Sequence, residues 1–588
     1  MRRGPTGSGA TLPVTRCQQR RVRPAPPLVL AILALAALLA GCGFSFGGAG
    51  PTATPPARPS RAATPPTPLP ARELGGVLTP PARTPSPAPR GEQTLTIAAG
   101  GGAPILDPAL VRDAGAAFLV HQLFRGLVRL DDALQPVPDL AERIAIGDDG
   151  LTYTFTLREG AVFHDGRPIG AAAVKYSLER ATDPALAAGE GGRLPGGTYL
   201  SDIVGARDKL AGRARELRGV RVVDERTVTI ALDAPKVPFL MKLSHPSAAI
   251  VDEASVRGGP RWWRAPNGSG PFRLDRLDAG QLVMTRFDRF YAGGPPLERV
   301  VVLLGAAAGD PMNLYERGRI DYTRVPLSSV DRVMVETDPL HAELTVTPSL
   351  SLTYVGFNVT APPFDDPAVR RALVQALDRG KIARVSLGGR AVEARGIVPP
   401  TMPGGPWEGI VPAYDLAAAR ADLAASRYGG PAGLPRAAIY GSSGTIPVTM
   451  RQVYERDLRL ALEVIGVDWP EYLDGLNARA YPAFELTWIA DYPDPENFLA
   501  VLFATGSGEN HTAYSNPEVD RLLAAAALER DPARRHALYL DAQQRILDDA
   551  AIIPISHAID YTLVKPHVRG LAITPMGILD LDSVWIER

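Results

Sequence analysis

A proline-rich segment at residues 43–90 confines folding to the rest of the chain. It includes the run PTATPPARPSRAATPPTPLP, and Pro, Thr, Ala, Gly and Arg dominate it throughout. Few of its side chains are aromatic or β-branched and apolar, so it cannot bury enough surface to offset the entropy lost on folding. We therefore expect residues 42–92 to form a disordered, extended linker, with the folded body beginning near Gln93.

The residues before this linker have the layout of an export signal. A cluster of arginines between residues 16 and 23 precedes an apolar stretch at residues 28–40, which is shorter than the roughly 20 residues that a membrane-spanning helix needs. The small residues LAGC at 39–42 resemble a bacterial lipobox, in which the cysteine is lipidated and the chain is cut before it. This resemblance predicts a signal peptide over residues 1–41 and a membrane anchor at Cys42. A plain signal peptide that happens to end in cysteine is the alternative.

Charge and cysteine content exclude several classes of protein. The 63 basic and 63 acidic side chains balance, so nothing points to a nucleic-acid partner. The only cysteines are Cys17 and Cys42, which leaves the folded body without disulfides, thiolate metal sites or a cysteine nucleophile. Dinucleotide-binding G-x-G-x-x-G, phosphate-loop and H-E-x-x-H motifs are absent from the sequence as well. We expect no metal, no cofactor and no enzymatic activity.

The folded body mixes strand and helix patterns. Residues 94–99 alternate like a strand, as do Tyr153, Phe155 and Leu157. The sequence VRVVDERTVTIAL at 220–232 predicts a hairpin, and residues 114–130 carry apolar side chains at helical spacing. Val174, Leu178 and Ala181 share one helical face, and the run Asp365-Asp366-Pro367 predicts a second helix with aspartate at its N-cap. The interleaving of the two patterns predicts an α/β protein with several sheets.

Six stretches of the body together resemble one family. They are similar, in the same order, to segments of the peptide-binding members of the solute-binding proteins that serve ATP-binding-cassette importers, family 5. These stretches cover residues 105–131, 153–180, 267–274, 356–382, 487–499 and 551–571.

The resemblance implies the type II periplasmic-binding-protein fold, in which two lobes joined by a hinge close on a solute. Carried onto this sequence, lobe I gathers residues 91–124, 251–349 and 557–588. An extra domain occupies residues 125–250, and residues 350–556 form the other lobe. The ligand is expected in the cleft between the lobes.

The stretch TWIADY at 487–492 is expected to hold the ligand. In peptide-binding relatives the aspartate after Trp-x-Ala pairs with the α-ammonium of the peptide, and here that aspartate is Asp491. Trp488 and Tyr492 are expected to line the same site. Two alternatives stay open: Asp491 caps the turn that follows the strand, and Trp488 is an ordinary core residue.

The contact for a peptide carboxylate is less evident in the sequence. Some relatives place an arginine shortly before the Trp-x-Ala-Asp element, where this chain has Glu485. Arg479 lies further back, and Arg451 precedes a segment that we expect to be a helix ending at Gly466. Both arginines are predicted ligand contacts, with solvated surface charges as the alternative.

The resemblance implies a monomeric, lipid-anchored receptor on the extracytoplasmic side of a bacterial membrane. It is expected to capture di- or oligopeptides and deliver them to the permease of an ATP-binding-cassette importer. Three alternatives stay open. In the first, the same fold serves a non-peptide solute such as a nickel complex, an opine, a sugar or another cationic nutrient. In the others, the chain acts as a sensor or adhesin, or it is an anchored hydrolase.

Overall fold

The computed structural model describes residues 76–79, 92–99, 102–189, 194–442 and 444–587, which belong to one compact unit. The predicted signal peptide, the lipidation site Cys42 and most of the predicted linker lie outside these residues. No helix in the described part of the chain combines the length and apolar character needed to cross a membrane.

A five-stranded antiparallel sheet forms the smaller of the two main sheets. Its helical cover includes α2 (Ala171–Ala181), whose Val174, Leu178 and Ala181 are buried, as the helical spacing predicts. The predicted hairpin is confirmed as two paired strands. The strands, in spatial order, are β1 (Val77–Leu78), β5 (Ala141–Ile146), β6 (Thr152–Leu157), β8 (Thr227–Ala231) and β7 (Val220–Val222).

Strand β1 corrects the predicted extent of the disordered linker. Val77 and Leu78 lie within residues 42–92, yet they pair with Ala145 and Ile144 at the edge of the smaller sheet. The physical reason is local, because this apolar pair interrupts the proline-rich composition and can add to an open sheet edge.

The larger of the two main sheets has twelve strands. Ten of them form a continuous path, and β13 (Leu344–Pro348) and β15 (Ala391–Glu393) pair with β19 beside it. The path, in spatial order, is β17 (Leu462–Gly466), β16 (Ala437–Gly441), β18 (Ala483–Ile489), β14 (Ser351–Phe357), β19 (Ile552–Val564), β12 (Tyr322–Arg324), β2 (Thr94–Ala98), β11 (Arg299–Leu303), β10 (Gln281–Arg286) and β9 (Phe272–Leu277).

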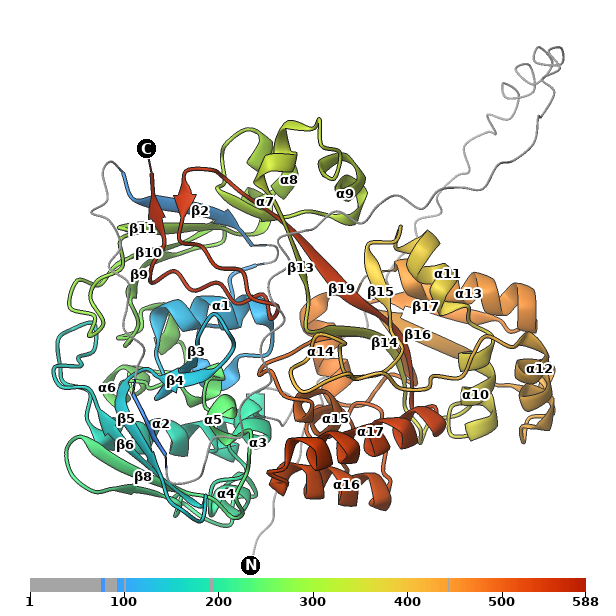
Figure 1. Ribbon diagram of the computed structural model, residues 1–588, viewed down its shortest axis with the longest axis horizontal. Coiled ribbons are helices and arrows are strands. Elements are labelled where there is room, and N and C mark those ends of the chain that lie inside the picture. The colour runs from blue at the N-terminus through green and yellow to red at the C-terminus, as the bar shows by residue number, and fades with distance from the viewer. Residues whose placement is uncertain (1–75, 80–91, 100–101, 190–193, 443, 588) are drawn as a thin grey trace, which may run out of the picture. The chain divides into compact units, whose positions relative to one another are not determined.

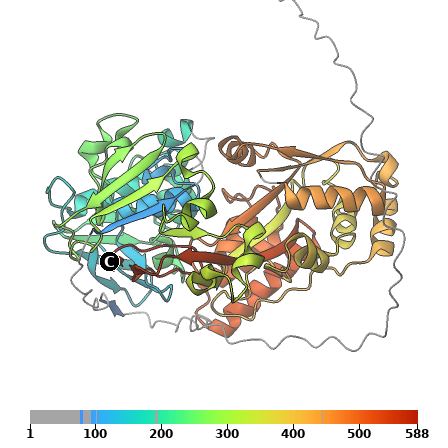
Figure 2. The ribbon, with the colours of Figure 1, turned by 90° about the horizontal axis from the view of Figure 1, so that it is seen from above.

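Strand β19 connects two groups of strands in this sheet. The first group is β17, β16, β18 and β14, and the second is β12, β2, β11, β10 and β9. The first half of β19 pairs with β14 and its second half with β12 and β13. Figure 1 shows it as the long red strand that crosses between them. Seen from above in Figure 2, the blue and green strands gather on one side of this crossing and the orange strands on the other.

Two short ribbons and the helices complete the body. The ribbons pair β3 (Val128–Leu130) with β4 (Pro136–Pro138), and β20 (Val568–Arg569) with β21 (Trp585–Ile586). The other helices are α1 (Ala114–Leu123), α3 (Pro195–Tyr199), α4 (Ala206–Leu210), α5 (Phe239–Lys242), α6 (Glu253–Val256), α7 (Gly305–Ala308), α8 (Pro311–Glu316), α9 (Leu327–Val333), α10 (Pro367–Gln375), α11 (Arg379–Lys381), α12 (Leu416–Ala425), α13 (Thr445–Leu458), α14 (Trp469–Asn477), α15 (Glu496–Phe503), α16 (Pro517–Leu528) and α17 (Pro532–Asp548).

Helices cover both faces of the β14–β18–β19 part of the sheet. Every residue of β14 is buried, and its side chains alternate between two apolar cores. Val355 packs with residues of α10, α12 and α13, whereas Tyr354 packs with residues of α14 to α17. Burial on both faces is consistent with the absence of charged residues from the β14 sequence, SLTYVGF.

The helix predicted over residues 114–130 is shorter in the structure. Helix α1 ends at Leu123, and Val128–Leu130 forms strand β3. Gly126 lies in the connection, where an added Cβ would come within 3.4 Å of two backbone carbonyl oxygens. The apolar spacing therefore continued past the point where the chain leaves the helix.

Candidate functional site

Strand β18 fixes the position of the predicted ligand-binding stretch. It pairs with β14 in antiparallel register, with Ile489 opposite Ser351. Beyond its end, the amide of Ala490 still donates to the carbonyl of Leu350 at 2.8 Å. Asp491 therefore leaves the sheet at a defined point beside the first residue of β14.

The Asp491 carboxylate is contacted by two neutral donors. The Tyr199 hydroxyl donates to Oδ2 at 2.5 Å, and Asn497 Nδ2 lies 3.4 Å from the same oxygen. Burial raises the pKa of Asp491 to about 6, although both hydrogen bonds act in the opposite direction. Within the described part of the chain, no basic side chain forms an ion pair with this carboxylate.

The neighbouring buried carboxylates, in contrast, are paired with bases. Lys242 Nζ lies 2.8 Å from both Asp202 Oδ2 and Glu496 Oε1, and all three side chains are at most one-tenth exposed. Arg535 Nη2 lies 2.8 Å from Asp494 Oδ1. Asp491 differs from these acids, because no basic side chain in the described part of the chain pairs with it. A ligand cation could supply the missing positive charge.

In the turn after β18, the capping contact is made by Asp494. The amide of Glu496 donates to Asp494 Oδ1 at 3.0 Å, at the start of α15. The Asp491 side chain instead reaches Tyr199, which is 292 positions away in the sequence. One of its two donors is therefore distant in the sequence, and the other, Asn497, lies six positions further on.

Trp488 and Tyr492 lie beside this carboxylate in different environments. Trp488 is half-buried, and its Nε1 donates to Asn497 Oδ1 at 2.8 Å. Tyr492 is fully buried, meets the Tyr199 ring edge to face at a centroid distance of 6.2 Å, and donates to Glu496 Oε2 at 3.2 Å. Trp488 therefore offers an accessible surface, whereas Tyr492 is buried against the ring of Tyr199.

The two predicted arginines are not brought to Asp491 by any contact among the described residues. Arg479 Nε donates to the carbonyl of Asn510 at 3.1 Å, and Arg451 is exposed on α13. Glu485 lies on β18, where burial raises its pKa to about 7.

The helix predicted to end at Gly466 is wrong in its boundary. Helix α13 ends at Leu458, and Leu462–Gly466 forms strand β17. Arg459 adopts a left-handed conformation with φ of 58°, which terminates the helix. The β-branched residues of LEVIG then favour a strand.

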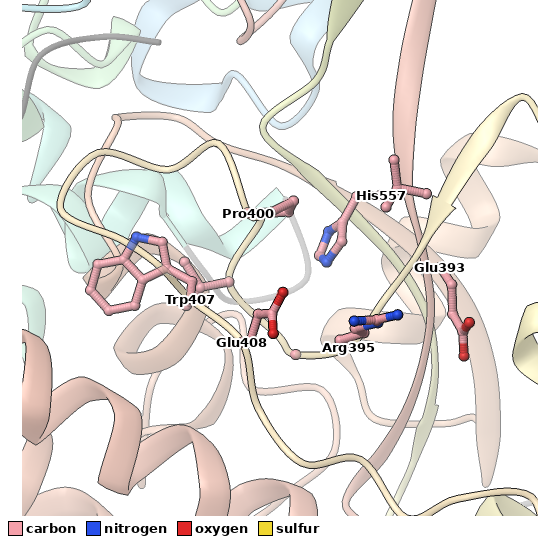
Figure 3. A pocket seen from close by; sticks show the side chains of 9 residues that line it. Glu393, Arg395, Pro400, Trp407, Glu408 and His557 are labelled. Carbon is pink, nitrogen blue, oxygen red and sulfur yellow. The ribbon is translucent and has the colours of Figure 1, made fainter. Parts of the chain in front are cut away.

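A cavity that the sequence did not indicate lies beside β15 and β19. Its volume is about 410 Å³. Figure 3 shows Pro400, His557, Arg395 and Glu408 around one space, with Glu393 and Trp407 farther out. The lining residues are Val392, Glu393, Arg395, Gly396, Val398, Pro400, Trp407, Glu408 and His557.

One strand separates this cavity from the Asp491 segment. The carbonyl of Ser351 on β14 accepts a hydrogen bond from His557 Nδ1 at 2.8 Å, and Ser351 pairs with Ile489 on β18. Strands β18 and β19 flank β14, so two strand spacings, roughly 10 Å, separate them.

Tyr199, Asn497 and the cavity residues carried no usable signal in the sequence. Asn497 follows Asp491 closely, in PENFL, but only the structure shows it holding both Trp488 and Asp491. Among the described residues there is no group of three His, Cys, Asp or Glu side chains that could hold a metal ion.

Comparison with known proteins places the chain in a family. Residues 135–510 match the model of the bacterial extracellular solute-binding proteins, family 5. The chain is 30% identical over 503 residues to the probable deoxycholate-binding periplasmic protein YgiS of Escherichia coli, covering 82% of this chain and 91% of YgiS. It is 27% identical over 498 residues to the periplasmic oligopeptide-binding protein OppA of Escherichia coli, covering 82% and 90% of the two chains.

Solved structures agree with this assignment. The murein tripeptide-binding protein MppA of Escherichia coli matches with a TM-score of 0.77 and 25% identity, covering 85% of this chain and all of MppA. The unliganded open form of MppA matches with a lower TM-score of 0.62.

The chain belongs to the bacterial extracellular solute-binding proteins of family 5. Its fold is the type II periplasmic-binding-protein fold predicted from the sequence. Members of this family are extracytoplasmic receptors that bind solutes for import.

Proposed function

We propose that this chain captures short peptides with a free α-ammonium group and delivers them to an ATP-binding-cassette permease without altering them chemically. The observation that carries the proposal is the Asp491 carboxylate, which is desolvated and contacted only by neutral donors among the described residues. A ligand ammonium supplies the missing charge through a charge-assisted hydrogen bond. Trp488 offers a flat apolar wall beside it.

The relatives OppA and MppA are an oligopeptide-binding and a murein tripeptide-binding protein. Arg451 and Arg479 stay predictions for the ligand carboxylate that no contact in the structure supports.

A deoxycholate-like anion is the second candidate, because YgiS is a probable deoxycholate-binding protein. The charges favour the peptide instead. No basic side chain in the described part of the chain pairs with Asp491. An anionic solute would meet this unpaired negative charge.

Asp491→Asn tests the proposed ammonium contact. Calorimetric titration of the full chain with Ala-Ala-Ala should show affinity falling by about 10- to 100-fold in this variant, as expected when a charged hydrogen bond is lost. N-acetyl-Ala-Ala-Ala should bind poorly to wild type and variant alike, and Asp275→Asn, at an exposed carboxylate, serves as the control. Unchanged affinity for Ala-Ala-Ala in Asp491→Asn would exclude the contact, and tight binding of sodium deoxycholate would favour the second candidate.

The same proposal includes a lobe arrangement and an anchor. Residues 91–124, 251–349 and 557–588 form one lobe, residues 125–250 the extra domain and residues 350–556 the other lobe. A signal peptide of residues 1–41 is removed, and the monomeric receptor is held at the membrane by lipid on Cys42. Cys42→Ser should move the protein from the membrane fraction to the soluble fraction, and retention in the membrane would contradict lipidation.

A further inference from the structure

We propose that the cavity beside β15 and β19 is a second ligand subsite, which takes an ammonium or guanidinium group and so selects ligands with a basic side chain. The inference deepens the proposed function, because it assigns chemistry to the part of the ligand that lies beyond the α-ammonium. It rests on the proposed function for the identity of that ligand, and on the cavity alone for the preferred charge.

The hydrogen-bonding role of His557 is fixed by its partner. Its Nδ1 lies 2.8 Å from the carbonyl oxygen of Ser351, which can only accept, so Nδ1 carries the hydrogen. Burial lowers the pKa of His557 to about 4, so the ring is neutral at pH 7. In a neutral ring with hydrogen on Nδ1, Nε2 is a lone-pair acceptor.

This acceptor is available to a ligand. His557 is only 3% exposed, yet it lines the cavity, and Nε2 has no hydrogen-bond partner among the described residues. Its ring faces the space between Pro400, Arg395 and Glu408 (Figure 3). A buried acceptor that faces a cavity favours a ligand group that donates hydrogen bonds.

The charges of the cavity have the same preference. Glu408 contributes a carboxylate and Arg395 a guanidinium to the space, whereas Glu393 lies farther out and interacts with Arg379. In the described part of the chain neither Glu408 nor Arg395 forms an ion pair with another residue within 4 Å. The carboxylate of Glu408, beside the neutral imidazole, can therefore pair with a ligand cation.

The cavity has room for a long basic side chain. Its volume of about 410 Å³ lies within the range of about 300–1,000 Å³ typical of small-molecule sites. Val392, Val398 and Trp407 supply apolar walls that can contact the methylene groups of lysine or arginine, while the charged end reaches Glu408 and His557.

Matched peptides test the preference for charge. The full chain is titrated with Ala-Lys-Ala and with Ala-norleucine-Ala, which has a side chain of similar length but no charge. Wild type should bind the lysine peptide about tenfold more tightly, as one charged hydrogen bond implies. 1,5-Diaminopentane is the third probe, because it carries the same ammonium group without a peptide backbone.

Variants then assign the preference to named residues. Glu408→Gln should reduce the preference for the lysine peptide to about twofold or less, whereas Arg395→Gln should increase it, because a repelling charge is removed. Arg436→Gln, at an exposed arginine before β16, should leave it unchanged. A rise in norleucine preference in Arg395→Gln, or an unchanged preference in Glu408→Gln, would overturn the proposal.

Two substitutions of His557 separate ligand contact from folding. Asparagine can keep the donor to Ser351 but lacks an acceptor at the position of Nε2, so His557→Asn should lose the lysine preference. Glutamine can place an oxygen near the position of Nε2, so His557→Gln should keep most of the preference even if its thermal stability is lower. The reverse order would contradict the assigned role.

The outcomes distinguish this inference from the proposed function. Binding of Ala-Ala-Ala that depends on Asp491, with no preference between lysine and norleucine, overturns the subsite and leaves peptide capture standing. Binding of 1,5-diaminopentane that depends on Glu408, with no tripeptide bound, supports the subsite and overturns peptide capture. Binding of none of the probes overturns both.

Discussion

At the residue scale, the unpaired charge of Asp491 has a consequence for stability. Its pKa in the folded protein is about 6, above the ordinary value of 3.8, so the native state binds this proton more tightly than the unfolded state does. The unfolding free energy therefore falls as the pH rises from about 4 to 6 and stays reduced above that range. Ionised Asp491 costs on the order of 1–3 kcal/mol at pH 7.

Asp491→Asn should remove this cost, because asparagine keeps the acceptor for Tyr199 but carries no charge. We expect the variant to be more stable than wild type by about 1–3 kcal/mol at pH 7.5 and nearly equal to it at pH 4. Urea unfolding of the ligand-free full chain at the two pH values measures this difference. Equal stability at both pH values would show that the carboxylate is well solvated in the folded protein.

At the element scale, the cap of helix α10 (Pro367–Gln375) shows where local sequence was sufficient. Asp366 Oδ1 accepts from the amide of Ala368 at 2.8 Å, as the Asp-Asp-Pro run predicts, and its Oδ2 accepts from the amide of Arg427 at 2.8 Å. Asp366→Ala should lower the unfolding free energy by about 1–2 kcal/mol, the usual cost of a lost cap, and leave peptide affinity unchanged. Asp366→Asn, which keeps an acceptor, should lose less than half as much, and a similar loss in both variants would rule out capping as the cause.

The elements also show which parts of the site the sequence could predict. The hairpin of β7 and β8 depends on neighbours close in the chain, so periodicity and turn residues were enough. Tyr199 reaches Asp491 from 292 positions away, and a contact of that kind leaves no pattern in a single sequence. His557 was missed because ISHAI sits within a long apolar strand, where a histidine looks like a core residue.

At the scale of the whole molecule, Lys242 joins two hydrophobic cores. Helix α5 (Phe239–Lys242) packs with the smaller sheet, and α15 (Glu496–Phe503) packs with the larger one. Lys242 bridges them through Asp202 on its own side and Glu496 on the other, at 2.8 Å each. These charges are buried, so removing the lysine leaves two carboxylates without their partner.

Lys242→Met should therefore lower the unfolding free energy by about 3–5 kcal/mol, as found when one partner of a buried ion pair is removed. Lys175→Met is the matched control, because Lys175 pairs with Glu179 and Glu216 at the surface and should cost less than about 1 kcal/mol. Since the pair links the cores, we also expect calorimetry of Lys242→Met to show separate unfolding of the two cores where wild type shows one transition. A single transition with a loss no larger than that of Lys175→Met would mean that apolar packing alone couples them.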